Sequence, residues 1–137
     1  MARRYRRKRR NCGGMTAATH LRNVSRGFAK RGASPEQVLD MQRLARRIVR
    51  GVVCTYCEAS VDGITFSLDH RQPISRGGSH DIENLAICCK RCNMAKGSMS
   101  YDEYCSLLYL LRTFCDGGES VLRRLVSSGN MFRRRRS

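Results

Sequence analysis

The sequence predicts a small α+β protein in which two short strands and a helix form the core and longer helices flank it. Two cysteine pairs, Cys54 with Cys57 and Cys89 with Cys92, each leave two residues between their members. Short apolar runs typical of strands lie between the pairs, and apolar residues at helical spacing lie outside them. A chain of 137 residues is long enough for one domain with a modest core.

The first predicted helix covers 16–29, where apolar side chains recur at intervals of three and four residues. Thr16 is a weak cap for it, and Gly27 lowers its stability. His20 in this helix is interpreted as an ordinary surface residue. The basic side chains of the segment fall at or near its exposed side: Arg22, Arg26 and Lys30.

The second predicted helix covers 35–50 and has clearer end signals. Ser34 supplies an N-cap, Pro35 stands at the first helical position, Gln37 follows three residues after the cap, and Gly51 ends the helix. Four arginines lie away from the centre of its apolar stripe, and we expect them to contact nucleic-acid phosphates rather than form only a solvated face. They are Arg43, Arg46, Arg47 and Arg50.

Between the cysteine pairs we expect a strand, a long loop and a second strand. The apolar residues of 64–68 alternate with polar ones, which predicts one buried face. Leu85 to Cys88 is an apolar run suited to the second strand, and turn-prone glycines lie between the two. Asp69 and His70 should then leave the first strand.

A short helix should begin near Cys89 and end at Gly97, because a residue without a Cβ can adopt a left-handed cap. The four paired cysteines have the spacing of a tetrahedral structural zinc site. The other cysteines have no metal role in this prediction, and Cys88 serves as a small buried apolar residue.

From Asp69 to Gly97 the chain resembles the HNH endonuclease family, whose fold is the ββα-metal finger. The resemblance covers roughly positions 43–97 and rests on Asp69-His70, on Asn84 fourteen residues after His70, and on Asn93 nine residues further. Three short stretches also match: Pro73 to Gly78, Cys89 to Asn93, and Lys96-Gly97. The last motif position holds Asn93 instead of histidine, a form also found in active family members.

This resemblance implies a metal-dependent DNA endonuclease that hydrolyses phosphodiester bonds. His70 would be the general base, Asp69 and Asn93 would bind one catalytic Mg²⁺ or Mn²⁺, and Asn84 would brace the loop that presents His70. Three basic residues flank the proposed site and are candidates to steer or clamp phosphates: Arg76, Lys90 and Lys96. Lys90 and Arg91 can equally be exposed spacers between the zinc ligands. His80 lies in the same loop, and we expect it to contact neither metal nor DNA.

A noncatalytic zinc-containing protein that binds nucleic acid, for example RNA or a ribosome, is the alternative. It would explain the cysteines and the basic residues, but it needs no Asp69, His70, Asn84 and Asn93 at these intervals. The sequence leaves open whether the biological role is phage DNA processing, a mobile element or restriction.

The charge supports a nucleic-acid partner, because the formal net charge is +16. Residues 1–10 carry seven basic side chains and 133–136 carry four, with no acids in either stretch, so we expect disordered basic tails. Residues 11–50 add a net +6, and residues 51–132 carry a net −1. Nonspecific attraction to DNA should therefore come from the arms and the N-terminal helices.

The sequence of the C-terminal part predicts two helices that pack on the core. Ser100 and Glu103 form a capping box for a helix that ends near residue 116, and a last helix covers 119–127. These helices are expected to close the core together with the 35–50 helix, and a homodimer through their leucine-rich face stays open. The expected organisation is a basic flexible arm (1–14), a basic helical segment (15–50), the nuclease module (51–99), the C-terminal helices (100–132) and a basic tail (133–137).

The cysteines and the N-terminus bear on the compartment. The N-terminus has no apolar signal core, and the longest apolar run, Leu107 to Leu111, is too short to span a bilayer. Paired cysteines that bind metal favour a reducing cytoplasm, in a bacterium or a phage-infected host cell. A nuclear location stays open for a eukaryotic setting.

Overall fold

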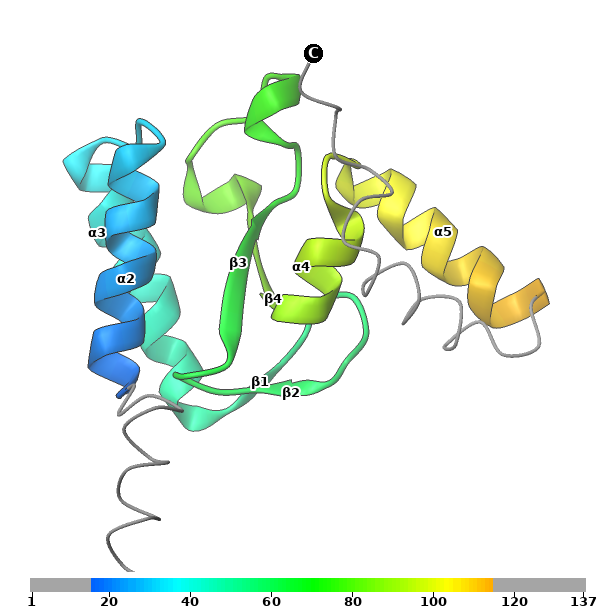
Figure 1. Cartoon of the computed structure of the whole chain (residues 1–137), viewed down its shortest axis with the longest axis horizontal. Coiled ribbons are helices and arrows are strands. Elements are labelled where there is room, and N and C mark those ends of the chain that lie inside the picture. Colours follow the sequence, from blue (N-terminus) through cyan, green and yellow to red (C-terminus); the bar gives the residue numbers. More distant parts are fainter. Residues whose placement is uncertain (1–15, 115–137) are drawn as a thin grey trace, which may run out of the picture.

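The computed structural model describes residues 16–114, in which helices surround two small antiparallel sheets (Figure 1). The elements in chain order are α2 (Ala17–Lys30), α3 (Pro35–Arg46), β1 (Val52–Val53), β2 (Ser60–Val61), β3 (Phe66–His70), β4 (Leu85–Cys89), α4 (Lys90–Lys96) and α5 (Tyr101–Phe114). β1 pairs with β2 and β3 pairs with β4. The predicted α+β architecture with a strand, strand and helix core is confirmed.

The β3–β4 hairpin lies in the middle of the molecule. In Figure 1, α2 and α3 lie on one side of the hairpin, and α4 and α5 lie on the other. We predicted that the C-terminal helices would close the core with the 35–50 helix. For α5 this is confirmed, because its residues Tyr104, Leu108 and Leu111 belong to the same core cluster as Met41, Ala45 and Ile48, although α5 lies across the hairpin from α3. The predicted helix over 119–127 lies outside the described residues.

The two N-terminal helices begin where their caps predict. The Thr16 side chain accepts a hydrogen bond from the Thr19 backbone N–H, and Ser34 and Gln37 form a reciprocal capping box. The predicted 35–50 helix is α-helical only to Arg46, because residues 47–50 tighten into a 3₁₀ turn. Gly51 follows with φ of 79°, a conformation that favours glycine.

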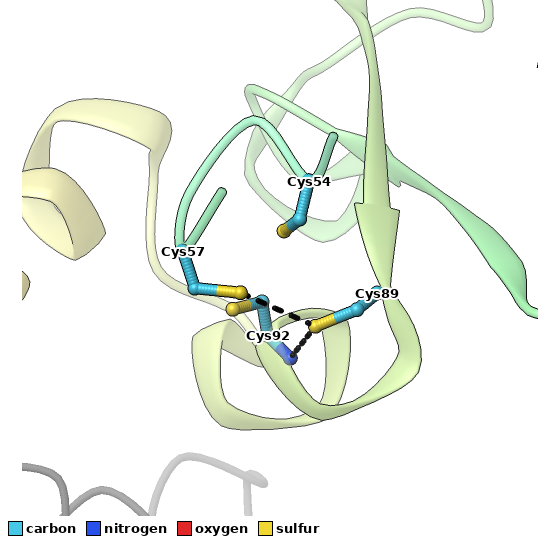
Figure 2. Close-up of side chains that lie close together, drawn as sticks. All are labelled: Cys54, Cys57, Cys89 and Cys92. Carbon is cyan, nitrogen blue, oxygen red and sulfur yellow. Dashed lines mark hydrogen bonds between the residues drawn. The ribbon is translucent and has the colours of Figure 1, made fainter. Parts of the chain in front are cut away.

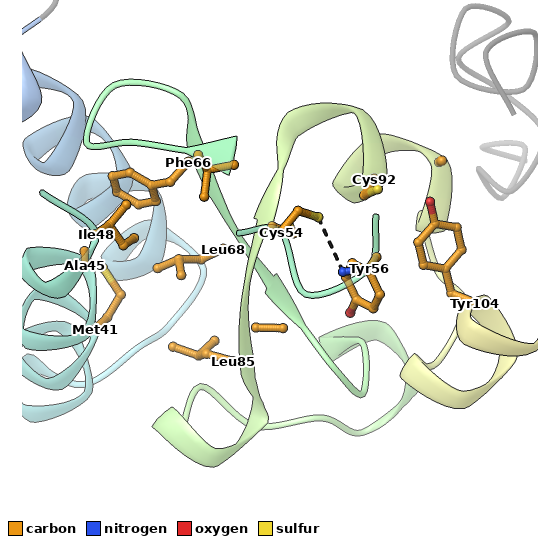
Figure 3. Packing of buried hydrophobic residues seen from close by; sticks show 14 of the residues in the cluster. Met41, Ala45, Ile48, Cys54, Tyr56, Phe66, Leu68, Leu85, Cys92 and Tyr104 are labelled. Atoms are coloured by element: carbon orange, nitrogen blue, oxygen red, sulfur yellow. Dashed lines mark hydrogen bonds between the residues drawn. The ribbon is translucent and has the colours of Figure 1, made fainter. Parts of the chain in front are cut away.

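The hairpin register fixes which side chains share a face. Phe66 pairs with Cys89, Leu68 with Ile87, and His70 with Leu85, while Ser67 and Asp69 point to the other face. Figure 3 shows Phe66, Leu68 and Leu85 directed toward Met41, Ala45 and Ile48 of the N-terminal helices, with Tyr56 and Cys54 on the opposite side. Both faces of the hairpin are therefore buried, which explains the apolar run in β4.

One boundary differs in a way that matters for the site. We expected Asp69 and His70 to leave the first strand, but both remain in β3 and pair with β4. Because successive strand residues point to opposite faces, the two side chains are directed away from each other. The predicted strand began two residues too early because Thr65 caps a turn through the Asp62 carboxylate instead of pairing.

The helices after β4 also follow their end signals. Cys89 is the N-cap of α4, and Gly97 follows the helix with φ 53° and ψ −122°. The expected left-handed cap is therefore correct in the sign of φ but not in ψ. The Ser100 capping box with Glu103 is present at the start of α5. No helix within residues 16–114 is long and apolar enough to cross a membrane.

Candidate active site and metal centre

The four paired cysteines meet at one point, as predicted. Their sulfur atoms all lie within 4.8 Å of one another. Cys54 and Cys57 lie in the turn of the β1–β2 hairpin, and Cys89 and Cys92 lie at the start of α4, so two distant segments converge (Figure 2). In a tetrahedral site with zinc–sulfur bonds of about 2.3 Å, sulfur atoms are about 3.8 Å apart. The Sγ atoms of Cys57 and Cys89 are 3.7 Å apart.

The backbone around the cysteines also suits a metal site. The amide of Tyr56 donates to Cys54 Sγ and the amide of Cys92 donates to Cys89 Sγ, each at 3.4 Å. Such bonds stabilise thiolates and orient them. The hydrogen bond from the Cys92 thiol lowers the pKa of Cys54 to about 4, so one member of the cluster favours the ionised form that binds metal.

A buried tyrosine supports the same interpretation. The Tyr104 hydroxyl has no hydrogen-bond partner within the described part of the chain, although its side chain is fully buried. Burial raises the pKa of Tyr104, and the Cys92 thiol raises it further. A metal-bound thiolate at Cys92 accepts hydrogen bonds, so it would give this hydroxyl the partner it lacks. The donor set and its surroundings therefore fit a structural zinc ion.

Asp69 is the centre of a buried polar network on the same face of the hairpin as Tyr56. The Lys96 ammonium lies 3.1 Å from Asp69 Oδ1 and also donates to the backbone oxygen of His70 at 2.9 Å. The Tyr56 hydroxyl donates to Asp69 Oδ2. Burial raises the pKa of Asp69, while the bonds from Tyr56 and Lys96 act in the opposite direction.

This network corrects one prediction. We expected Lys96 to contact phosphate, but its side chain is completely buried and its charge is neutralised by Asp69. Its helical position, three residues after Asn93, places both side chains on the same side of α4. Lys96 is a structural cation in this conformation, and a phosphate cannot reach it.

The expected ligands of the catalytic ion come from facing elements, Asp69 from β3 and Asn93 from α4. A carboxylate and a carboxamide oxygen suit a hard divalent cation. Asn93 is half-buried, and its side chain has no hydrogen bond to any residue of 16–114. Asp69 is only 5% exposed and has both oxygens occupied, so an ion fits at this pair only if the Lys96 ammonium moves away or shares the carboxylate.

His70 lies on the opposite face of β3. Its ring stacks on the fully buried Phe28 of α2, with centroids 5.3 Å apart. Burial lowers the pKa of His70 to about 4, with smaller electrostatic contributions from His80, Arg31 and Lys96. The imidazole is therefore neutral at physiological pH and has a lone pair available for a proton.

Asn84 joins the two ends of the loop between the strands. Its Oδ1 accepts from the Gln72 backbone at 2.8 Å, and its Nδ2 donates to the carbonyls of Gln72 at 2.9 Å and Ser79 at 2.8 Å. All three bonds are to backbone groups, so the side chain satisfies backbone donors and acceptors that have no strand partner in the loop. This is the geometry that a bracing role requires, and its effect on catalysis stays a prediction.

The predicted phosphate-contacting arginines fall into two groups. Arg43 and Arg46 of α3 and Arg47, which follows it, are exposed, and Arg43 also pairs with Asp40 at 3.1 Å. The Arg50 side chain lies outside the described set. Arg76 forms a bidentate pair with Glu103, at 2.6 and 3.0 Å, so its guanidinium is already engaged in this conformation.

Sequence reasoning missed two functional candidates and misjudged a third residue. His80, interpreted as an unremarkable loop histidine, is 8% exposed and hydrogen-bonded to His70. The sequence marks Tyr56 only as a spacer between two cysteines. His20 is no free surface residue, because its Nε2 lies 2.8 Å from the Phe66 carbonyl and its ring packs on Phe66. Two signals in the sequence could have identified them. Tyr56 is a polar aromatic residue next to a predicted zinc ligand, and His80 is a second histidine in the loop that follows His70.

Comparison with known proteins gives one match. The model of the family described as HNH endonuclease matches residues 54–99, which include both cysteine pairs, the β3–β4 hairpin and α4. No curated protein and no solved structure matches the chain significantly.

Proposed function

Because residues 54–99 match the HNH endonuclease family, we propose that the chain is a metal-dependent DNA endonuclease that hydrolyses phosphodiester bonds. The family match is the observation that carries this proposal. Its span includes the four convergent cysteines and every residue that the motif requires, from Asp69 to Asn93. A nucleic-acid substrate follows from the family in general, and the choice of DNA is our proposal.

His70 is the general base in this proposal. It is half-buried at the end of β3, neutral at physiological pH and held by α2 through Phe28. It removes a proton from the water that attacks the phosphorus atom. Asn84 keeps the loop after His70 closed through its three backbone bonds, and the structural zinc would connect the turn between β1 and β2 to the start of α4.

Asp69 and Asn93 would hold the catalytic divalent ion, Mg²⁺ or Mn²⁺, in a conformation in which the contact between Lys96 and Asp69 is open. When bound, the ion would neutralise charge on the phosphate and on the leaving oxygen. The chain itself supplies a carboxylate from β3 and a carboxamide from α4.

The N-terminal helices are the proposed DNA-binding surface. Arg46 and Arg47 are exposed there, and most of the positive charge of the chain lies in residues 1–50 and 133–136. The six cysteines of the described residues are free thiols, which suits a zinc site in a reducing cytoplasm. A homodimer through the C-terminal helices remains part of the proposal.

The described Asp69 network favours one alternative, a noncatalytic zinc-containing protein that binds nucleic acid. If Lys96 never leaves Asp69, the ion has no site and the chain only binds. Incubating the purified protein with supercoiled plasmid separates the two functions. The nuclease nicks the plasmid with Mg²⁺ or Mn²⁺, leaves 5′-phosphate and 3′-hydroxyl ends, and stops with EDTA; the binding protein shifts the plasmid without nicking it.

A further inference from the structure

A second histidine connects the proposed general base to the end of a helix. His80 lies in the loop between β3 and β4, and its Nδ1 is 3.1 Å from His70 Nε2. The other ring nitrogen, His80 Nε2, is 3.0 Å from the backbone oxygen of Arg31. His80 is 8% exposed, so these two contacts are made away from bulk water.

The Arg31 carbonyl determines the direction of both hydrogen bonds. A carbonyl oxygen only accepts, so His80 Nε2 carries a hydrogen and donates it. A neutral imidazole has one N–H, which leaves His80 Nδ1 as an acceptor. His70 Nε2 must then donate to it. In a neutral His70 ring this leaves Nδ1 as the nitrogen with the free lone pair.

The carbonyl at the start of this chain of hydrogen bonds is available for a structural reason. Arg31 is the C-cap of α2, and the residue four positions later is Pro35, which has no N–H to offer it. Carbonyls at the C-terminus of a helix lack partners within the helix and carry partial negative charge. His80 therefore satisfies the end of α2, and the helix end favours N–H donation from the histidine pair.

The neighbours of His80 hold it in place. Phe28 packs on both imidazoles, with ring centroids 5.3 Å from His70 and 5.6 Å from His80. The Asp81 side chain accepts a hydrogen bond of 2.8 Å from Gln37 of α3, which fastens the loop next to His80. A Cβ at Gly78 would meet the Gln72 backbone oxygen at 1.9 Å, so the loop can close in this way only with glycine there.

We propose that His80 is a positioning residue that fixes His70 in the tautomer with the hydrogen on Nε2, so that Nδ1 is the atom that removes the proton from water. This inference rests on the proposed nuclease function. As the water oxygen forms its bond to phosphorus, its proton moves to His70 Nδ1, the bond from phosphorus to the leaving sugar oxygen breaks, and that oxygen takes a proton from solvent. The charge on His70 is stabilised through His80 and the Arg31 carbonyl.

Two matched substitutions test the acceptor on His80. His80→Phe keeps an aromatic ring against Phe28 but removes the acceptor, and His80→Asn supplies an amide oxygen near the position of Nδ1. We expect His80→Phe to lower kcat for plasmid nicking by about tenfold to a hundredfold, within the range known for residues that orient a reacting group, with KM changed less than about twofold. His80→Asn should recover most of the kcat. Zinc content and the circular dichroism spectrum serve as folding checks for both variants.

The tautomer can be measured without any activity. Two-bond ¹H–¹⁵N correlation spectra of the wild-type protein should show His70 with a hydrogen on Nε2 and an unprotonated Nδ1, and the His80→Phe protein should show a mixture of tautomers. If the wild type does not nick DNA but has this tautomer, the nuclease proposal fails and the positioning by His80 stands. Wild-type His70 with its hydrogen on Nδ1, a wild-type kcat in folded His80→Phe, or an equal loss in both variants would overturn the inference.

Discussion

The β3–β4 hairpin is held on its two faces by different interactions. On the side of α2 and α3, Phe66 and Leu68 pack into an apolar layer (Figure 3), and the His70 ring stacks on Phe28 and forms a hydrogen bond with His80. On the side of α4, a buried ion pair between Asp69 and Lys96 lies beside four convergent cysteines. The first face is held mainly by packing and a few hydrogen bonds, whereas the second combines compensated buried charge with a cysteine cluster that fits a metal ion.

The difference suggests a division of labour. In the proposed function, the packed face presents the neutral base His70 and the charged face presents the groups for a cation. Asp69 and His70 are adjacent in β3 but point to opposite faces of the hairpin, so each belongs to a different one of these two environments. Substitutions that change one face, each compared with a matched control substitution, test this division.

Removing a zinc ligand should damage the charged face most. Cys57→Ser should unfold the module or sharply lower its stability, because zinc binding supplies about 10 kcal/mol or more of folding free energy in small zinc domains. Elemental analysis and circular dichroism check this. Cys105→Ser, a half-buried cysteine of α5 outside the cluster, is the matched control and should keep one zinc per chain. Folded wild-type protein without zinc would contradict the metal assignment.

The buried ion pair should be the next most sensitive feature. Lys96→Met leaves the Asp69 carboxylate buried without its cation, which typically costs about 3–5 kcal/mol. The pKa of Asp69, already raised by burial, should rise further, so the variant should recover relative stability as the pH falls below that pKa. Urea unfolding at two pH values measures both effects. Lys90→Met removes an exposed charge from the same helix, and an equal loss in both variants would mean that the pair is unimportant.

The DNA-binding surface should respond more weakly. Changing Arg46 and Arg47 to glutamine should lower the salt slope of duplex DNA binding by about 0.9 for each phosphate that the variant no longer neutralises. The control removes the same charge from the exposed residues Lys90 and Arg91 on α4. Fluorescence anisotropy over a range of salt concentrations compares the two proteins. Equal slopes would place DNA elsewhere than on the N-terminal helices.

The smallest effect should come from the exposed pair between Arg76 and Glu103. The hydrogen bond from Arg76 lowers the pKa of Glu103 to about 2 from its usual 4.5. A lowered carboxyl pKa adds stability above pH 4.5 that is lost as the pH falls toward 2. Arg76→Gln should therefore lower the Tm slightly at pH 7, and the difference should vanish near pH 2. A difference that persists in acid would mean that the pair acts through packing.

Local signals in the sequence predicted much of this architecture. The caps at Thr16, Ser34 and Ser100 marked the three longer helices, because a cap depends only on residues within one turn. The cysteine spacing predicted the metal cluster because four ligands admit few arrangements. Both kinds of signal can be recognised in the sequence without knowledge of the tertiary structure.

The predictions that failed depend on contacts between distant segments. Lys96 looked like a phosphate ligand because nothing near it in sequence reveals the buried Asp69 carboxylate, 27 positions away. His80 looked unimportant because its partner, the Arg31 carbonyl, is 49 positions away. The core-closing role of α5 was predicted, but its position across the hairpin from α3, where Tyr104 contacts Tyr56, was not, because a helical pattern does not indicate which face of a sheet the helix covers.

The most direct test of the central claim is plasmid nicking by His70→Ala beside the wild type, with Mg²⁺ or Mn²⁺ in both reactions. His70 contributes no ligand to the cysteine cluster, so the variant should keep its zinc and its DNA affinity while its cleavage rate falls by at least about a hundredfold. The zinc content and a binding isotherm are measured on the same preparation. Cleavage by zinc-loaded His70→Ala at the wild-type rate, free of contaminating nuclease, would contradict the account.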